Sequence, residues 1–268
     1  DLEMQQIARE FNFSESAFVF PAEYGHTRKV RIFTPTLEVP FAGHPNIGTA
    51  FALAQDGTFG DIDKQINVVF EEKVGFVPVS IRYDDRDQIW CELAAPEMLS
   101  IGSSMSIKSV ASILCLDTTD IVTTTHLPQV ASVGLPFLFV ELSSISALQR
   151  AEVNISQLNK LVTQLGVSYI HMYFKSADDF DIRARMFAPM DGVPEDPATG
   201  SANCALGGLL SHYNDASSGN FEWLIAQGIE MGRPSILKAR TQKNDGEVTC
   251  TYIGGSCVMV SEGIIYVD

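Results

Sequence analysis

Two segments of the chain share a pattern of hydrophobic and polar positions, 154 residues apart. The first has the i, i+3, i+4, i+7 spacing of an amphipathic helix at Met4, Ile7, Ala8 and Phe11. Adding 154 to each number leads to four further apolar residues, Leu158, Leu161, Val162 and Leu165. The spacing therefore predicts two related amphipathic helices, one near the start of each half of the chain.

The same offset relates two turn motifs. Residues 31–40 read RIFTPTLEVP and residues 185–194 read RMFAPMDGVP, so both fit R-x-F-x-P-x-x-x-V-P. Each motif leads into a helix of small apolar residues, the first starting near Pro45 and the second near Gly200, and we expect both helices to be buried. A single repeat of this length indicates a duplicated domain and not a solenoid, whose period is much shorter.

The remaining pattern predicts an α+β protein in which strands surround these helices. Strand-like runs cover 17–20, 29–33, 66–70, 76–82, 89–93, 137–142, 167–174, 181–187, 236–240, 248–253 and 258–260. A short helix is expected to end near Leu114. We place the N-terminal half at residues 1–105 and the C-terminal half at 106–268, with the last strand returning to the first half.

The repeat also reveals a gap. The strand at 137–142 precedes the second amphipathic helix, and its equivalent in the first half would lie before residue 1. The first half therefore lacks its opening strand. Either the chain starts late, or another segment, with 263–267 as the candidate, fills the place.

Composition narrows the class of protein. The chain has 268 residues, of which 46% are hydrophobic, and no apolar run has the length of a membrane span or the form of a secretory signal. We therefore expect a cytoplasmic protein with a substantial core. A net charge of −15 argues against nucleic acids and anionic membranes as partners.

Cysteine spacing and motifs narrow the chemistry. Five cysteines without a C-x-x-C pair favour small buried thiols in a reducing compartment over disulfides or a metal site. The sequence contains no phosphate loop, dinucleotide fingerprint or zinc-binding pattern, so we predict no metal and no cofactor.

The starts of the two apolar helices are the candidate binding sites. A helix N-terminus presents unpaired N–H groups and the positive end of a dipole, and glycine lets a ligand approach the backbone. Gly43 and Gly200 lie at these two positions. We expect the two helix starts to face each other across a cleft that binds a small anionic metabolite. A homodimer is one option for the assembly.

Residues that break the internal repeat are the candidates for catalysis. Glu15 corresponds at the 154-residue offset to Tyr169, Asp196 lies in a three-residue insertion of the second half, and His44 corresponds to Ser201. Glu15, His44, Asp196 and Ser201 form a candidate acid/base set. Each also has a purely structural interpretation: Glu15 as a solvated turn residue, His44 and Ser201 as helix caps, and Asp196 as a turn opener.

Four segments resemble the phenazine-biosynthesis PhzF-like isomerases, distant relatives of diaminopimelate epimerase. They are IAREFNFSES (7–16), FTPTLEVPFAGHPNIGTA (33–50), EDPATGSA (195–202) and MGRPS (231–235). The resemblance implies two pseudo-symmetric halves, each a curved mixed sheet around a central helix. It also implies catalytic roles for Glu15, His44, Asp196 and Ser201. Gly43 and Gly200 would open the substrate-binding helix ends, where His44 and Ser201 also bind.

The resemblance implies a cofactor-independent isomerase in which Glu15 takes a proton from carbon and returns it elsewhere. We expect burial to bring the pKa of Glu15 nearer neutrality. The epimerase relatives use two cysteines where this chain has Ala42 and Thr199, which excludes a two-thiol racemisation. The family's opening strand with a Gly-Asn-Pro motif is missing from the chain.

Two other functions remain open from the sequence. One is a non-catalytic small-molecule-binding protein on the same fold. The other is an epimerase that uses a carboxylate pair, with Glu15 and Asp196 on opposite faces of the substrate.

Overall fold

The computed structural model describes residues 1–266, apart from the side chain of Leu161. The chain forms two compact units: unit 1 is Asp1–Ala94 with Gly254–Asp268, and unit 2 is Ala95–Ile253. The chain thus passes from one unit to the other twice. The sequence-based boundary between residues 105 and 106 remains a prediction about the duplicated halves.

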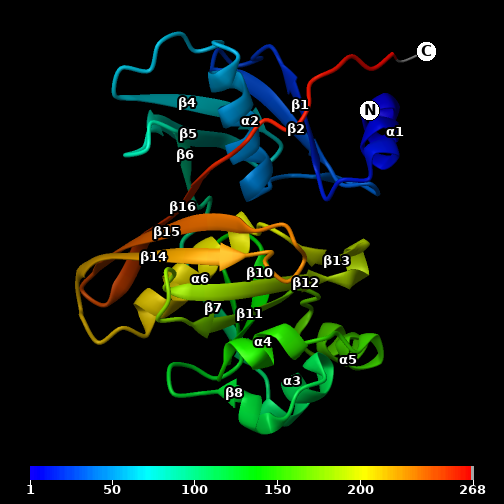
Figure 1. Ribbon diagram of the computed structural model, residues 1–268, viewed down its shortest axis with the longest axis vertical. Helices are drawn as coiled ribbons and strands as arrows, with labels where there is room; N and C mark the ends of the chain where they lie inside the picture. Colours follow the sequence, from blue (N-terminus) through cyan, green and yellow to red (C-terminus); the bar gives the residue numbers. More distant parts are fainter. Residues whose placement is uncertain (267–268) are drawn as a thin grey trace. The chain divides into compact units, whose positions relative to one another are not determined.

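Unit 1 is a sheet with one buried helix. Its elements are α1 (Leu2–Phe11), β1 (Ser16–Phe20), β2 (Arg28–Phe33), β3 (Glu38–Val39), α2 (Gly43–Gln55), β4 (Gln65–Glu72), β5 (Gly75–Tyr83) and β6 (Ile89–Ala94). The strand order is β1-β2-β4-β5-β6, parallel between β2 and β4 and antiparallel at the other three pairings that are described residue by residue. Helix α2 contacts β1, β5 and β6, and its apolar side chains complete the core of this unit (Figure 1).

Unit 2 repeats the plan with extra elements. Its helices are α3 (Ile107–Leu114), α4 (Ile145–Arg150), α5 (Ile155–Leu165) and α6 (Gly200–His212). Its strands are β7 (Ser100–Ser104), β8 (Ile121–Val122), β9 (Gln129–Ser132), β10 (Pro136–Leu142), β11 (Ile170–Lys175), β12 (Ile182–Ala188), β13 (Val193–Asp196), β14 (Gly219–Gln227), β15 (Ser235–Asn244) and β16 (Glu247–Ser256), whose last residues belong to unit 1.

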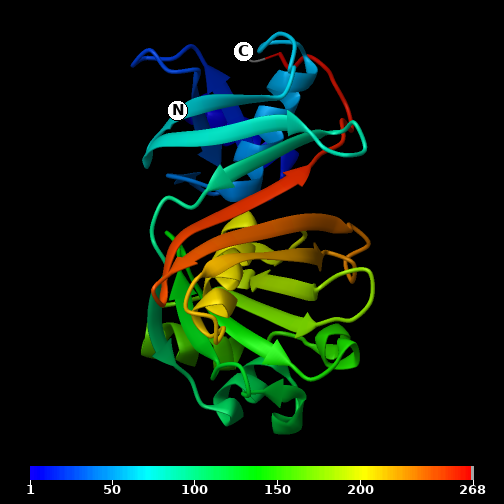
Figure 2. The ribbon, with the colours of Figure 1, turned by 90° about the vertical axis from the view of Figure 1, so that its left-hand side faces the viewer.

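The sheet of unit 2 follows the order β16-β15-β14-β12-β11-β10-β9-β7. Helix α6 contacts β9, β10, β14 and β15 and is buried along almost its whole length, as its small apolar residues predict (Figure 2). A second apolar cluster is formed by residues of α3, α4 and α5 together with residues of the sheet. Figure 1 shows these three helices gathered on one side of this unit.

The two units share strand register as well as element order. In unit 1, Ser16 of β1 pairs with Phe33 of β2, and in unit 2, Ile170 of β11 pairs with Phe187 of β12. Both members of the second pair lie 154 residues after those of the first. Helix α2 then starts at Gly43 and helix α6 at Gly200, so the start of α6 lies three residues beyond the 154-residue offset. The duplication and the three-residue insertion predicted from sequence are therefore confirmed within each unit.

One predicted strand is wrong. Within the described residues, 257–266 form no helix or strand, so the strand expected at 258–260 is not formed. Residues 263–266 do not form the strand for which 263–267 was the candidate, and Val267 lies outside the described residues. The side chains of Val258 and Val260 are 80% and 90% exposed. A β-rich sequence forms a strand only where a neighbouring strand pairs with it, and no such pairing is found here within residues 257–266.

Thiols and helix lengths complete the description of the fold. No cysteine forms a disulfide; Cys91 and Cys204 are buried, as expected for small hydrophobes, whereas Cys115 is exposed. Within residues 1–266, no helix combines the length and the apolar character needed to span a membrane.

Candidate active site

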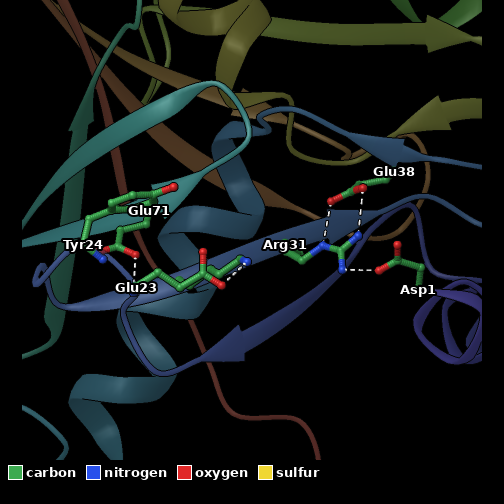
Figure 3. Close-up of polar contacts among 7 residues, drawn as sticks. Asp1, Glu23, Tyr24, Arg31, Glu38 and Glu71 are labelled. Atoms are coloured by element: carbon green, nitrogen blue, oxygen red, sulfur yellow. Dashed lines mark hydrogen bonds and ion pairs between the residues drawn. The ribbon is translucent and has the colours of Figure 1, made fainter.

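The repeated R-x-F motif anchors the turn that leads to each buried helix. In unit 1, Arg31 donates from Nε and Nη2 to the two carboxylate oxygens of Glu38, at 2.8 and 2.9 Å (Figure 3). In unit 2, Arg185 makes the same two bonds to Glu195 at the same two distances. Such two-point pairs fix both position and orientation. The chain therefore enters α2 and α6 from turns that are held in the same way.

The start of α2 carries the first two predicted site residues. Extended backbone at Ala42 leads into Gly43, which is buried, and Pro45 takes a place where a helix loses no internal hydrogen bond. The N-cap residue is Ala42, so His44 does not cap this helix. The N–H groups of the first turn have no partner inside the helix and present positive potential at Gly43 and His44.

Glu15 and His44 are in direct contact. Glu15 follows α1, which ends at Asn12 in the left-handed conformation (φ 53°). The Nε2 atom of His44 lies 3.2 Å from Oε2 of Glu15, and the two side chains are 33% and 20% exposed. Glu15 is therefore a largely buried residue with a specific partner. The interpretation of Glu15 as a solvated turn residue is wrong.

The pKa of Glu15 corrects one prediction. Burial is the largest single influence and raises this pKa, but the hydrogen bond and charge of His44, with a contact from Ser14, together outweigh burial. The pKa of Glu15 is therefore lowered, whereas the sequence led us to expect a value nearer neutrality. The expectation failed because it considered burial without the imidazole beside the carboxylate.

The start of α6 carries the other predicted residues. Asp196 ends β13 and is buried; Gly200 is the first residue of α6, and Ser201, which is half-buried, is the second. The N-cap residue is Thr199, so Ser201 does not cap this helix. The Thr199 hydroxyl donates to Oδ2 of Asp196 at 2.6 Å. Thr199 thus orients the carboxylate from the position where the epimerase relatives carry a thiol.

A buried amide network supports this turn. Gln227, at the end of β14, donates from Nε2 to the carbonyl oxygen of Asp196 at 2.6 Å and to the Thr199 hydroxyl at 2.8 Å. Its Oε1 accepts from the Thr199 N–H and from Nδ2 of Asn203. All four residues are buried. The network therefore holds the Asp196 turn and the first turn of α6 as one rigid piece.

Gly228, the residue after Gln227, positions the segment that contains MGRPS. Gly228 has φ +77°, and a Cβ atom there would lie 2.3 Å from the carbonyl oxygen of Arg233 and 2.8 Å from that of Pro197. Only glycine allows these backbones to approach so closely. The segment after β14 can thus pack against the turn that contains Asp196.

Sequence reasoning missed Gln227 and Asn203 and treated Thr199 only as an absent thiol. The signals were present but were not used: Asn203 is a polar residue inside an apolar helix, and β14 was not predicted although residues 220–223 alternate polar and apolar and residues 224–226 are apolar. Within residues 1–266, no group of three or more His, Cys, Asp and Glu side chains has the arrangement of a metal site.

Comparisons with known proteins agree with the resemblance. The family model described as "phenazine biosynthesis-like protein" matches residues 1–263. An uncharacterized isomerase of Mesorhizobium japonicum is 32% identical, with 98% of this chain and 88% of that protein covered. A trans-2,3-dihydro-3-hydroxyanthranilate isomerase of Pseudomonas aeruginosa is 31% identical with the same coverage. The predicted enzyme class, isomerase, is confirmed by these relatives.

Solved structures confirm the fold. A PhzF-family protein of Bacillus anthracis superposes with a TM-score of 0.90 at 22% identity, covering all of this chain and 89% of that one. A hydroxyproline epimerase of Agrobacterium vitis superposes with a TM-score of 0.63 at 13% identity, covering 90% of this chain and 71% of that one. Both identities are too low to carry more than the fold. With the family model matching nearly the whole chain and two relatives above 30% identity, the chain belongs to the phenazine biosynthesis-like, or PhzC-PhzF, family.

Proposed function

We propose that this isomerase moves a proton on a small carboxylate-bearing metabolite by acid/base catalysis, without a cofactor. The observation that carries the proposal is the contact between the Glu15 carboxylate and His44 at the start of α2. A carboxylate that is largely buried, paired with an imidazole and placed beside a helix N-terminus has the attributes of a general base.

Glu15 is the proton carrier in this proposal. Its lowered pKa means that it is ionised at neutral pH and starts as a base. It removes a proton from a carbon atom of the substrate, and the electron pair of that C–H bond shifts into the adjacent unsaturated system. Glu15, now a carboxylic acid, returns the proton to a different carbon of the same system. Atoms and electrons balance without any further reactant.

His44 sets the strength of this base. The contacts with His44 lower the pKa of Glu15, while burial raises it. A substrate that draws the imidazole away from Glu15 therefore removes an opposing influence and leaves burial to raise the pKa. The carboxylate becomes a stronger base only when substrate is bound, which limits wasteful proton uptake from water.

The start of α2 holds the substrate in this proposal. N–H groups at Gly43–His44 would bind a carboxylate or the charge that develops as the proton leaves carbon. The catalytic and binding roles of Asp196, Gly200 and Ser201 in unit 2 remain predictions from the sequence.

The first compound to test is trans-2,3-dihydro-3-hydroxyanthranilate, the substrate named for the Pseudomonas aeruginosa relative. The assay follows its disappearance and the product structure by NMR, and measures binding by the rise in melting temperature. An isomer with a moved hydrogen supports the proposal. Binding without reaction favours the non-catalytic binding protein, and inversion at a single carbon favours the carboxylate epimerase.

A cytoplasmic location and a homodimer remain predictions from the sequence. Cell fractionation tests the first, and light scattering of the purified protein at several concentrations tests the second.

A further inference from the structure

The internal duplication pairs two buried polar contacts, one in each unit. In unit 2, Asn203 of α6 donates to Oε1 of Gln227, at the end of β14, at 2.6 Å. Asn46 is the fourth residue of α2, and Asn203 is the fourth residue of α6, so Asn46 is the counterpart of Asn203. The strand registers Arg28 with Phe70 and Ile182 with Ile225 make Glu72 the counterpart of Gln227.

Unit 1 therefore has a carboxyl group where unit 2 has an amide. Both carboxyl oxygens of Glu72 are buried and make no hydrogen bond of good geometry, and the same holds for the side-chain amide of Asn46. The two groups are nevertheless neighbours, since Asn46 acts on the pKa of Glu72. Asn46 itself is fully buried.

The charged groups around Glu72 are engaged elsewhere. On β4 itself, Glu71 accepts from the backbone N–H groups of Glu23, Tyr24 and His26. Lys73, the residue after β4, reaches Glu38 at 3.9 Å.

The elements packed against β4 likewise bring no cation to Glu72. On α2, His44 pairs with Glu15. On β2, Arg28 donates to the carbonyl oxygen of Thr27, and Lys29 pairs with Glu23. On β5, the residue opposite Glu72 is Gly75. No ion pair found within residues 1–266 involves Glu72. A buried carboxyl group without a cation is more stable as the neutral acid. Burial accordingly raises the pKa of Glu72 to about 8, against a small lowering by Asn46.

We propose that Glu72 is a positioning residue that works as a neutral acid: it holds Asn46, and with it the first turn of α2, as Gln227 holds the first turn of α6. A neutral carboxyl group has an O–H donor as well as acceptor oxygens, and the amide of Gln227 likewise both donates and accepts at the corresponding place in unit 2. Its ionised form can still accept from Asn46, but it lacks a donor of the kind that Gln227 uses for the turn before α6, and it adds an unpaired buried charge. The α2 start that carries Gly43 and His44 then loses its support. The effect on turnover rests on the proposed function; the effect on unit 1 does not.

The direct test compares the full-length wild type with E72Q, which places the unit 2 residue in unit 1. A carboxyl ¹³C signal that titrates near pH 8 in the wild type and is missing in E72Q identifies the neutral acid. Between pH 4.5 and 8, Glu72 holds its proton in the native state and has lost it in the unfolded chain, a difference that E72Q lacks. The wild type's opening constant for the α2 amides, measured by hydrogen exchange, should therefore rise about tenfold per pH unit relative to E72Q. The exposed Glu10→Gln serves as the control and should follow the wild type.

Turnover supplies the second readout. In the wild type, the activity should fall above pH 8 as Glu72 ionises, and E72Q should move this alkaline limb to higher pH. The side chain of E72A can neither donate nor accept a hydrogen bond, so this variant should have a raised KM across the whole pH range. If exchange and the ¹³C signal change as predicted but no turnover is found, the inference stands and the proposed function fails. A Glu72 signal that titrates below pH 6, or parallel pH profiles for the wild type and E72Q, would overturn the inference.

Discussion

The imidazole of His44 lies 3.2 Å from the carboxylate of Glu15, although Glu15 follows α1 and His44 is the second residue of α2. The contact joins the only two members of the predicted acid/base set that lie in unit 1. It also sets the protonation of Glu15, because it overcomes the effect of burial on the pKa of that residue. Changing His44 should therefore change the chemistry of Glu15.

His44→Asn should raise the pKa of Glu15. The amide keeps a polar side chain at the start of α2 but removes the imidazole that lowers this pKa, and burial is then opposed only by the smaller effect of Ser14. The acidic limb of the pH profile of kcat/KM should move to higher pH, and turnover should fall by about 10- to 100-fold. His26→Asn changes an exposed histidine of the same unit and should leave the profile in place. An acidic limb that stays fixed in His44→Asn would show that His44 does not control Glu15.

The same contact has a consequence for stability. Because the pKa of folded Glu15 is below its value in the unfolded chain, the ionised carboxylate stabilises the fold above about pH 4.5, the ordinary glutamate value. That contribution should be lost as the pH falls through the folded pKa. The difference in unfolding free energy between the wild type and His44→Asn should therefore shrink under acid conditions, which denaturant titrations at several pH values measure.

Gln227→Ala should destabilise unit 2 more than an ordinary polar substitution. It removes two donors and an acceptor and leaves Asn203, Thr199 and the Asp196 carbonyl buried without their partner. We expect a loss of roughly 2–4 kcal/mol in the free energy of unfolding. Gln164→Ala, at an exposed position of α5, should change it by less than about 0.5 kcal/mol. Equal effects of the two substitutions would contradict the network's role.

Arg185→Lys should cost more stability than Arg31→Lys, although the two arginines are counterparts. Both substitutions lose a two-point contact with glutamate. Arg185, however, is 10% exposed and also donates to the carbonyl oxygens of Leu148, Gln149 and Ala151, whereas Arg31 is 21% exposed and its further contact is to Asp1. Parallel thermal unfolding of the two variants measures the difference, which we expect to be about 1–2 kcal/mol. A larger effect of Arg31→Lys would contradict this prediction.

Much of the fold could be predicted from the sequence because the same local patterns occur in both halves of the duplication. The helical spacing at Met4 and at Leu158, the repeated R-x-F motif and the small apolar residues of α6 each specify local structure. The strand predicted at 258–260 failed because strand formation depends on a neighbour that local pattern does not report. The strand β14 was missed although its sequence carries a strand pattern, with alternation at 220–223 and an apolar run at 224–226; in the structure it pairs with β12 and β15.

The candidate site was predicted in part. Glu15 and His44 emerged because they break the repeat, but the pKa of Glu15 depends on a distance between side chains that no sequence pattern gives. Gln227 and Glu72 could not be recognised as counterparts before the registers of β4 and β14 were known. The roles of Glu15, His44, Asp196 and Ser201, and of Gly43 and Gly200, remain predictions.

The most direct test of the central claim is the transfer of solvent deuterium to carbon by the wild type and by Glu15→Gln. Each protein is incubated with trans-2,3-dihydro-3-hydroxyanthranilate in heavy water, and product and remaining substrate are analysed by mass spectrometry and NMR. The variant keeps the shape of the side chain but cannot carry a proton, so its turnover and deuterium transfer should fall by about 10²-fold or more, while binding persists. Glu10→Gln should behave as the wild type. Full deuterium transfer and turnover by Glu15→Gln would contradict the account.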